Sequence, residues 1–281
     1  MIKKQLIMDT ALELFAENGI ESTSIKQITD RCGISKGAFY LSFTSKDELI
    51  FAMIEHFIGE FVSEVDQSVR QSEQADQMLY NFFYSSSIQF QEKSHYAKIF
   101  MKENLTALNH DIFLVLNKYD ESINAIIFSI IDQQFPQLND SMRADVAYTI
   151  KAFSKFYPEV TTISNYPVDL DTLCRSLAEK TIILAKQATI PFITKEYFST
   201  SMLSCLSPSK EQLQELLRKT KNDVNDETTL QSIDLLSNNL EDMSLPKAIV
   251  QGLLKNLQSN SYSKWAAYQY KLYTEQHEKA E

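Results

Sequence analysis

Residues 11–49 read ALELFAENGIESTSIKQITDRCGISKGAFYLSFTSKDEL, and this stretch decides the fold. In the segment that leads into it, apolar residues stand at positions 7, 11, 14 and 15, the spacing of one buried helical stripe. Gly19 follows, and glycine accepts the left-handed conformation that commonly ends a helix. The pattern therefore predicts a first helix over residues 3–18 that ends at Gly19.

Two short helices follow the first one. Ser24 stands three residues before Gln27, which is the spacing of a capping box at a helix start. Gly33 ends that helix after about two turns, and Ser35 is the natural N-cap of the next helix, over residues 36–42. Two short helices joined by a glycine-containing turn form a helix-turn-helix unit.

A longer helix begins after this unit. Ser45 and Glu48 have capping-box spacing, and an apolar series at positions 49, 50, 53, 54 and 57 continues from them. Phe39 and Phe43, one helical turn apart, are expected to face inward with the apolar residues of the first two helices. The first 46 residues thus form a three-helix domain with its own core.

The order of these features resembles the DNA-binding domain of the TetR (tetracycline repressor-like) family of bacterial transcriptional regulators. The resemblance rests on the LF pair followed by Gly19, on TSIKQI, on GISKGAFY and on SKDEL. Thr29 and Cys32 stand where the family commonly has Ala, and both are small enough to pack. Ser42 stands where the family commonly has His or Tyr, so it removes a large side chain near the phosphate backbone.

The helix-turn-helix geometry assigns roles to particular residues. In such units the N-terminal residues of the second helix reach base edges in the major groove. Lys36 is suited to guanine or a phosphate, and Gly37 and Ala38 allow close approach to the groove. Tyr40 is expected at a phosphate, and the start of the preceding helix offers backbone N–H groups to another. The candidate DNA contacts are Thr23, Ser24, Lys26, Ser35, Lys36, Gly37, Ala38, Tyr40 and Lys46.

The composition favours an all-α chain throughout. Five Gly and six Pro in 281 residues amount to about 4%, against roughly 12% in a typical globular chain. Sandwiches and barrels need more of both residues at their turns. The sequence contains no signal-peptide pattern and no apolar run of the roughly twenty residues that span a bilayer. Three widely spaced cysteines, Cys32, Cys174 and Cys205, fit neither a disulfide framework nor a metal knuckle, and we expect buried side chains in a cytoplasmic protein.

The charge is unevenly distributed. The net charge is −10, yet residues 22–46 carry four basic side chains and one acidic side chain. Residues 51–281 carry 21 basic and 30 acidic groups. A small basic region on an acidic body is compatible with localised DNA contact and limits nonspecific binding.

The remainder of the chain is predicted to form helices near 46–70, 75–92, 95–108, 111–134, 140–157 and 169–188. Pro158 and Pro167 are expected to mark the ends of a connection. The family resemblance implies that residues 47–205 are a ligand-binding and dimerisation domain whose last two helices pair across a twofold axis. The apolar residues of these helices fit that pairing and an internal core equally well. Dense aromatic residues between positions 80 and 157 suit either an apolar or aromatic effector or ordinary core packing, so no ligand-binding residue is assigned.

Residues 206–281 extend beyond the usual length of the family. The sequence predicts four helices here, which start at Ser207 or Ser209, at Asp226, at Pro246, and at Ser261 or Ser263. We interpret them as a helical extension, packed on the ligand domain or on a dimer partner, or as a separate interaction module.

The sequence predicts a homodimeric DNA-binding regulator, a repressor released from a pseudo-palindromic operator by a small molecule. No cofactor, metal or catalytic site is expected, because the four histidines are scattered and no phosphate-binding loop occurs. His95 and His110 leave open a metal-bound effector. Two further hypotheses are an architectural or division-related DNA-binding protein acting through protein partners, and a helical interaction protein that has lost DNA binding.

Overall fold

The computed structural model describes residues 2–92, 110–163, 168–194 and 208–278, and these residues form helices and no strand. The chain divides into two compact units. The first contains residues 1–63, 98–112 and 205–281, and the second contains residues 64–97 and 113–204. The N-terminal helices and the C-terminal helices therefore belong to the same compact unit.

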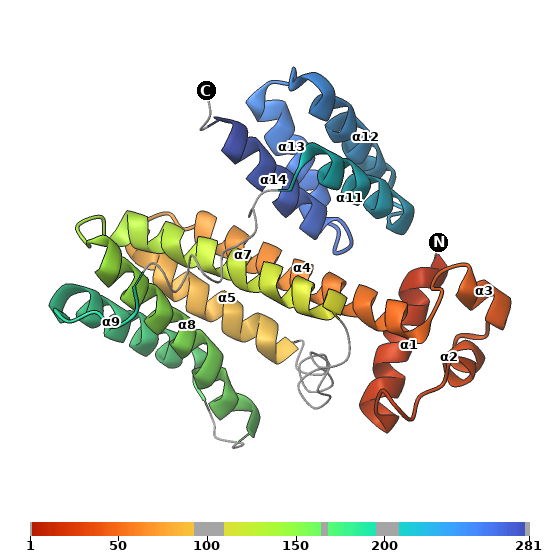
Figure 1. The fold of residues 1–281 in the computed structure, drawn as a ribbon, viewed down its shortest axis with the longest axis horizontal. Coiled ribbons are helices and arrows are strands. Elements are labelled where there is room, and N and C mark those ends of the chain that lie inside the picture. The colour runs from red at the N-terminus through yellow and green to blue at the C-terminus, as the bar shows by residue number, and fades with distance from the viewer. Residues whose placement is uncertain (1, 93–109, 164–167, 195–207, 279–281) are drawn as a thin grey trace. The chain divides into compact units, whose positions relative to one another are not determined.

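The N-terminal head consists of three helices and the start of a fourth (Figure 1). Their bounds are α1 Ile2–Asn18, α2 Ile25–Cys32, α3 Lys36–Tyr40 and α4 Lys46–Arg70. Its core is made of large apolar side chains that are at most 2% exposed: Ile7, Phe15, Ile28, Phe39, Phe43 and Leu49. The predicted inward orientation of Phe39 and Phe43 is confirmed.

The predicted ends of α1 and α2 are confirmed, but α3, predicted to run to residue 42, ends at Tyr40. The Ser42 N–H donates to the Phe39 carbonyl three residues back, at 2.8 Å, so the chain turns there instead of continuing the helix. Gly19 and Gly33 both have positive φ, 84° and 66°. Ser24 and Gln27 form both hydrogen bonds of a capping box, and Ser35 accepts a hydrogen bond from the backbone N–H of Ala38. The sequence pattern alone thus determines where α2 and α3 begin and where α2 ends.

The capping box predicted at the start of α4 is only half formed. The hydroxyl of Ser45 accepts from the backbone N–H of Glu48 at 3.0 Å, as expected. The Glu48 carboxylate, however, accepts from the N–H and hydroxyl of Thr44, both at 2.5 Å, and not from the N–H of Ser45. These hydrogen bonds hold the pKa of Glu48 below its ordinary value. The carboxylate reaches back one residue further because Thr44 offers it two donors.

The second unit is also helical. Its elements, besides the end of α4, are the 3₁₀ turn η1 Ala75–Gln77, α5 Met78–Glu92, α7 His110–Gln134, α8 Asp140–Ile163 and α9 Leu170–Gln187. Helix α5 packs against α8 and α9, and α8 packs against α9. The helix predicted over 95–108 lies outside the described residues.

The predicted end of α8 before Pro158 is wrong. The helix runs to Ile163 with Pro158 inside it. Proline removes one backbone donor and crowds the carbonyl four residues earlier, but a helix can absorb this by kinking. The rule that proline ends a helix failed here because a single proline costs only one hydrogen bond of a 24-residue helix.

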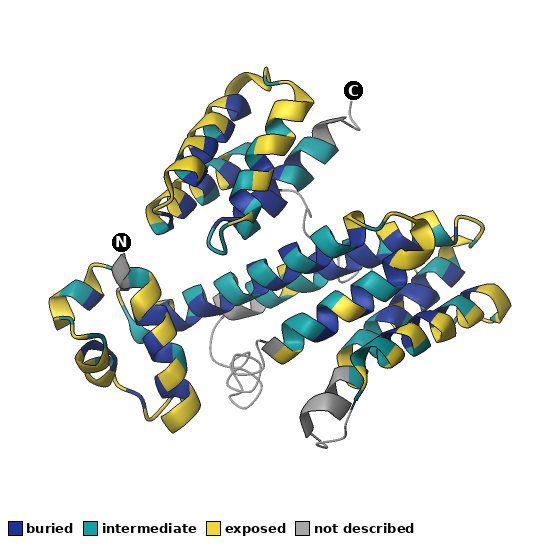
Figure 2. Cartoon of the chain, turned by 180° about the vertical axis from the view of Figure 1, so that it is seen from behind, coloured by how far each residue is buried: buried dark blue, intermediate teal, exposed yellow. Residues whose placement is uncertain are grey.

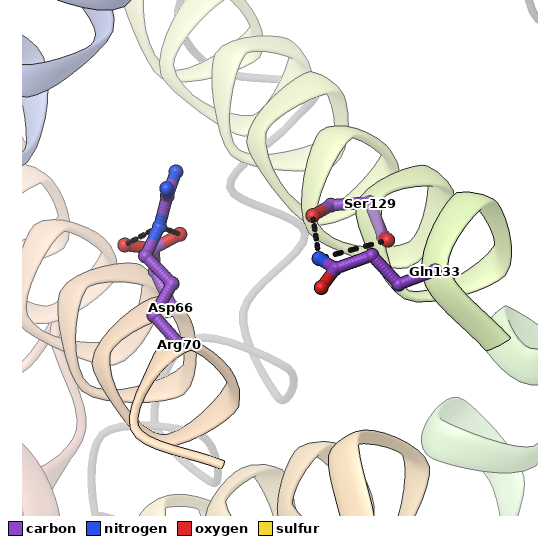
Figure 3. Close-up of polar contacts among 4 residues, drawn as sticks. All are labelled: Asp66, Arg70, Ser129 and Gln133. Atoms are coloured by element: carbon purple, nitrogen blue, oxygen red, sulfur yellow. Dashed lines mark hydrogen bonds and ion pairs between the residues drawn. The ribbon is translucent and has the colours of Figure 1, made fainter. Parts of the chain in front are cut away.

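Polar side chains in the second unit pair along their own helices (Figure 3). The Arg70 guanidinium donates from Nε to both carboxylate oxygens of Asp66, at 2.8 and 2.9 Å, one turn earlier on α4. On α7, the Gln133 amide donates to the backbone carbonyl and the hydroxyl of Ser129. The largely buried Asp66 carboxylate is thereby paired with a positive charge, as buried acids require.

The C-terminal module comprises residues 209–278 and four helices. They are α11 Lys210–Asp223, α12 Glu227–Asp242, α13 Lys247–Gln258 and α14 Lys264–Glu278. The predicted N-caps Ser209 and Asp226 are both present, the first as a full capping box. The module has an apolar core of its own that includes Leu213, Leu236, Leu257 and Tyr270. Inside that core, the Asn239 amide donates to the Tyr270 hydroxyl at 2.9 Å.

Candidate nucleic-acid interface

Helix α3 presents one exposed face and one buried face (Figure 2). Ser35, Lys36 and Gly37 are exposed, and Tyr40 is 51% exposed. Phe39 is fully buried, lies edge-on to Tyr40 with ring centroids 5.5 Å apart, and contacts Phe43. These two phenylalanines fix the rotation of the short helix, so its first turn must point away from the core.

The exposed face of α3 contains one residue that sequence reasoning missed. Leu41 is 89% exposed and follows Gly37 by four positions, as Tyr40 follows Lys36. Residues four apart lie on one helix face, so Lys36, Gly37, Tyr40 and Leu41 form a continuous surface. An apolar type predicts burial, and only its spacing from Gly37 could have identified Leu41. An exposed leucine here is suited to contact a thymine methyl group.

The start of α2 uses several of its polar groups internally. Thr23 is fully buried, and its hydroxyl donates to the carbonyls of Leu14 at 3.2 Å and Gly19 at 2.8 Å. The backbone N–H of Thr23 donates to Ile20, and that of Ser24 donates to the side chain of Gln27. Thr23 therefore fastens α2 to α1.

These bonds change which donors a phosphate could use at α2. Within the described residues, no hydrogen bond is recorded for the backbone N–H groups of Ile25 and Lys26. They lie at the positive end of the helix, where anions are favoured. The exposed Lys26 side chain stands at the same place. The predicted phosphate contact at Thr23 and Ser24 stays a prediction. The backbone N–H groups of Ile25 and Lys26 are the donors available to a phosphate beside them.

Lys46 lies at the start of α4 and is partly buried. Its ammonium donates to the backbone carbonyl of Ile20 at 2.6 Å. It thus holds the turn between α1 and α2 while keeping a positive charge near the surface. Arg31, another charge of this basic region, forms an exposed ion pair with Glu17 at 3.1 Å. Lys26 and Lys36 are therefore the cations of the predicted interface that are most available to bind DNA.

No metal-binding group of three or more side chains occurs among the described residues. His95 lies outside them, and nothing is described of the His110 side chain, so the metal-bound effector stays untested. Of the predicted buried cysteines, Cys174 is buried and Cys32 is half-buried, while Cys205 lies outside the described residues. Within the described ranges, no helix has the length and hydropathy to cross a membrane.

Alanine substitution is expected to have different effects on stability at Gly33, in the turn, and at Gly37, in α3. Gly33→Ala is expected to lower the free energy of unfolding by about 1–2 kcal/mol, because φ is +66° there and no neighbouring atom lies within 4 Å to add a clash. Gly37→Ala should leave the melting temperature unchanged or raise it, since its new Cβ meets only Ser35 Oγ at 3.7 Å. Chemical denaturation of both variants tests this. Equal destabilisation by the two would contradict the described turn.

An exposed first turn on a helix anchored by buried aromatics, after a glycine turn, defines a helix-turn-helix DNA-binding protein. Residues 7–53 match the model of "Bacterial regulatory proteins, tetR family". Residues 7–53 are thus a TetR-family DNA-binding domain, and the chain is a DNA-binding transcriptional regulator. The fold class and family expected from the sequence are confirmed.

Two curated relatives match over nearly their whole length. The uncharacterized HTH-type transcriptional regulator YerO of Bacillus subtilis is 24% identical over 263 residues, covering 91% of this chain and 89% of its own. The uncharacterized HTH-type transcriptional regulator YuxN of the same organism is 24% identical over 271 residues, covering 91% of each chain. Each alignment leaves out only about 9% of this chain, which is fewer residues than the C-terminal module contains. Both alignments therefore include most of that module.

A solved structure shows the same fold over a shorter stretch. The transcriptional regulator FadR from Bacillus subtilis, in complex with stearoyl-CoA, is 17% identical with a TM-score of 0.52. It covers 66% of this chain and 99% of that chain. The rest of this chain therefore has no counterpart in that structure.

Proposed function

We propose that this protein is a homodimeric, ligand-responsive repressor that binds a pseudo-palindromic operator. The observation that carries the proposal is the exposed surface of α3 formed by Lys36, Gly37, Tyr40 and Leu41. This surface spans less than two helical turns. Its mixture of one cation, one phenol and small or apolar groups suits insertion into a major groove. The predicted contacts other than the fully buried Thr23 remain the proposed interface, with Leu41 added.

Exposed apolar side chains on α8 and α9 support the homodimer. The apolar residues predicted for helix packing there, such as Ala144, Ala147, Ile150 and Leu177, are buried within the unit's own core. Others on the same two helices are exposed: Tyr148, Phe156, Ile183 and Leu184, between 39% and 58%. Several exposed apolar groups on neighbouring helices are typical of a contact with another chain. A second copy would bring two recognition helices to successive major grooves, about 34 Å apart.

We also propose that residues 1–46 bind DNA, that residues 47–205 bind the effector and dimerise, and that residues 206–281 are an extension. The FadR similarity, which covers 66% of this chain and 99% of that chain, supports an extension beyond the part shared with that regulator. The effector is proposed to be apolar or aromatic, because the helices of the second unit are rich in aromatic side chains. Many of these, including Phe82 and Phe83, are core residues and not ligand contacts.

The mechanism requires only a difference in effector affinity between two conformations. An effector that prefers the dimer with wrongly spaced recognition helices lowers operator affinity by its differential binding energy. Transcription in vitro from a promoter that carries a site selected from random duplex DNA tests the repressor. We expect added protein to reduce the transcript at least about tenfold, and effector to restore it. Stearoyl-CoA, the ligand of the FadR structure, is the first probe, followed by aromatic compounds. An increase in transcript on adding protein would contradict repression.

A further inference from the structure

The described side chains of helix α14 are buried or half-buried on every side of the helix. Of its described side chains, residues 264–275, none is exposed, and in Figure 2 the helix next to the C-terminal label shows no exposed segment. Ala266, Ala267, Tyr270 and Tyr273 face the core of the C-terminal module. A single four-helix module would leave the opposite face of its last helix in water. Another part of the chain must therefore cover that face.

Helix α4 provides that cover within the same compact unit. A Cβ built on Gly59 of α4 would lie 2.7 Å from Trp265 Cβ and 2.9 Å from Trp265 Cγ. These distances are shorter than real Cβ contacts, so the absence of a side chain at Gly59 is what lets Trp265 of α14 approach so closely. The glycine in the middle of α4, which costs helix stability relative to alanine, is explained by this contact.

Two further contacts lie beside this one. The His56 and Tyr262 rings stack with centroids 4.5 Å apart and planes 10° from parallel. Lys264 Nζ lies 3.7 Å from Glu60 Oε1, with both side chains less than 20% exposed. Together with Gly59 and Trp265, these pairs follow one side of α4 over more than a turn.

The module also contacts the DNA-binding head. Lys4 Nζ of α1 pairs with the Asp223 carboxylate at the end of α11, at 3.1 Å, and lies 5.6 Å from the centre of the Phe43 ring. The positive charges of Lys4 and Lys219 contribute, after the Thr44 hydrogen bonds, to the low pKa of Glu48 at the start of α4. The C-terminal module thus touches α1 near the recognition helix and α4 further along.

We propose that the C-terminal module is a brace that fixes α4 relative to the DNA-binding head, with Trp265 against Gly59 as its positioning contact. The proposal deepens the function proposed above and rests on it. A head held at two points loses less conformational freedom when it binds the operator, so the docked module raises operator affinity.

The docking face contains a feature of an interface that can open. Gln269 follows Trp265 by four residues, so it lies on the same side of α14. It is fully buried, and neither its amide nitrogen nor its amide oxygen has a hydrogen-bond partner. A buried amide without partners opposes docking, because water would satisfy both groups after separation. The balance between docked and separated states is therefore open to regulation.

Two glycine substitutions form a matched pair for the test. Gly59→Ala places a methyl group against Trp265, whereas Gly252→Ala adds one in the middle of α13, where no atom lies within 4 Å. Helix propensity alone favours alanine at both positions. Trp265 is the only tryptophan of the chain, so its fluorescence reports docking directly. Operator affinity is measured with full-length protein on a duplex selected by the wild-type protein, at a temperature where circular dichroism shows each variant folded.

We expect Gly59→Ala to shift Trp265 emission to longer wavelength and to weaken operator binding about tenfold, while Gly252→Ala changes neither. A Gly59→Ala protein with shifted emission and wild-type operator affinity would overturn the brace. Unchanged emission would overturn the docking contact itself. If the wild-type protein selects no DNA sequence, the proposed function fails, and the emission comparison still decides the docking.

The charge pair supplies a second test that changes no packing volume at Gly59. Glu60→Lys and Lys264→Glu should each weaken operator binding, and the double exchange should recover most of the loss. If the substitutions acted only by destabilising the protein, operator affinity would fall with the melting temperature. It would then not depend on whether the charges at positions 60 and 264 are opposite. No recovery in the double variant would contradict the brace.

Discussion

Replacing Lys36 and Tyr40 together by alanine will abolish specific operator binding, with an affinity loss of about 100-fold or more. Both side chains are exposed on α3, Lys36 at its first residue and Tyr40 at its last, and neither is buried in the core of the head. Each direct contact to a base or phosphate is worth about 1–3 kcal/mol, and the two lie on one helix face. Anisotropy of a labelled operator duplex, titrated at fixed salt, measures the loss.

The matched control for this prediction is Lys255→Ala, which removes an exposed lysine from α13. It should bind the operator as the wild-type protein does. The double variant should keep the wild-type melting temperature, because the buried Phe39 and Phe43 that hold α3 are untouched. Undiminished binding by the double variant would sink the assignment of α3 as the recognition helix.

Introducing glutamate at Ile183 and Leu184 will convert the proposed homodimer to a monomer. These neighbouring residues of α9 are 45% and 39% exposed in the single chain. Across a twofold axis each substitution occurs twice, so four carboxylates enter one apolar contact without partners. Operator affinity should fall about 100-fold as well, since a monomer engages one half-site and loses the gain of linked binding.

Sedimentation velocity, compared at equal protein concentration, measures the change in mass. Leu235→Glu on α12 is the control, because that leucine is 47% exposed and lies in the C-terminal module. It should sediment like the wild-type protein. A glutamate variant of α9 that remains dimeric would place the dimer contact elsewhere.

The local features of the head and of the module could be predicted from the sequence because each depends on residues close together in the chain. Ser24 with Gln27, Ser35, Ser209 and Asp226 all cap the helices they were expected to cap. Hydrogen bonds between residues two or three apart need no tertiary context. The same holds for the positive φ of Gly33.

Features that depend on distant residues could not be predicted. Gly59 lies in the middle of α4 with no local reason, and its explanation is Trp265, more than 200 residues away in the chain. Thr23 has the side chain of a DNA contact, yet the Leu14 and Gly19 carbonyls bind its hydroxyl. Leu41 has the side chain of a core residue, yet the core of the head is already filled by its aromatic neighbours.

Selection from random duplex DNA, followed by footprinting of the selected site, tests the central claim most directly. The wild-type protein should enrich an inverted repeat and protect two half-sites whose centres lie about 34 Å apart, one DNA turn, or a multiple of it. The protein with Lys36→Ala and Tyr40→Ala should protect neither half-site. Enrichment of no sequence, or the same footprint from both proteins, would contradict operator recognition through α3.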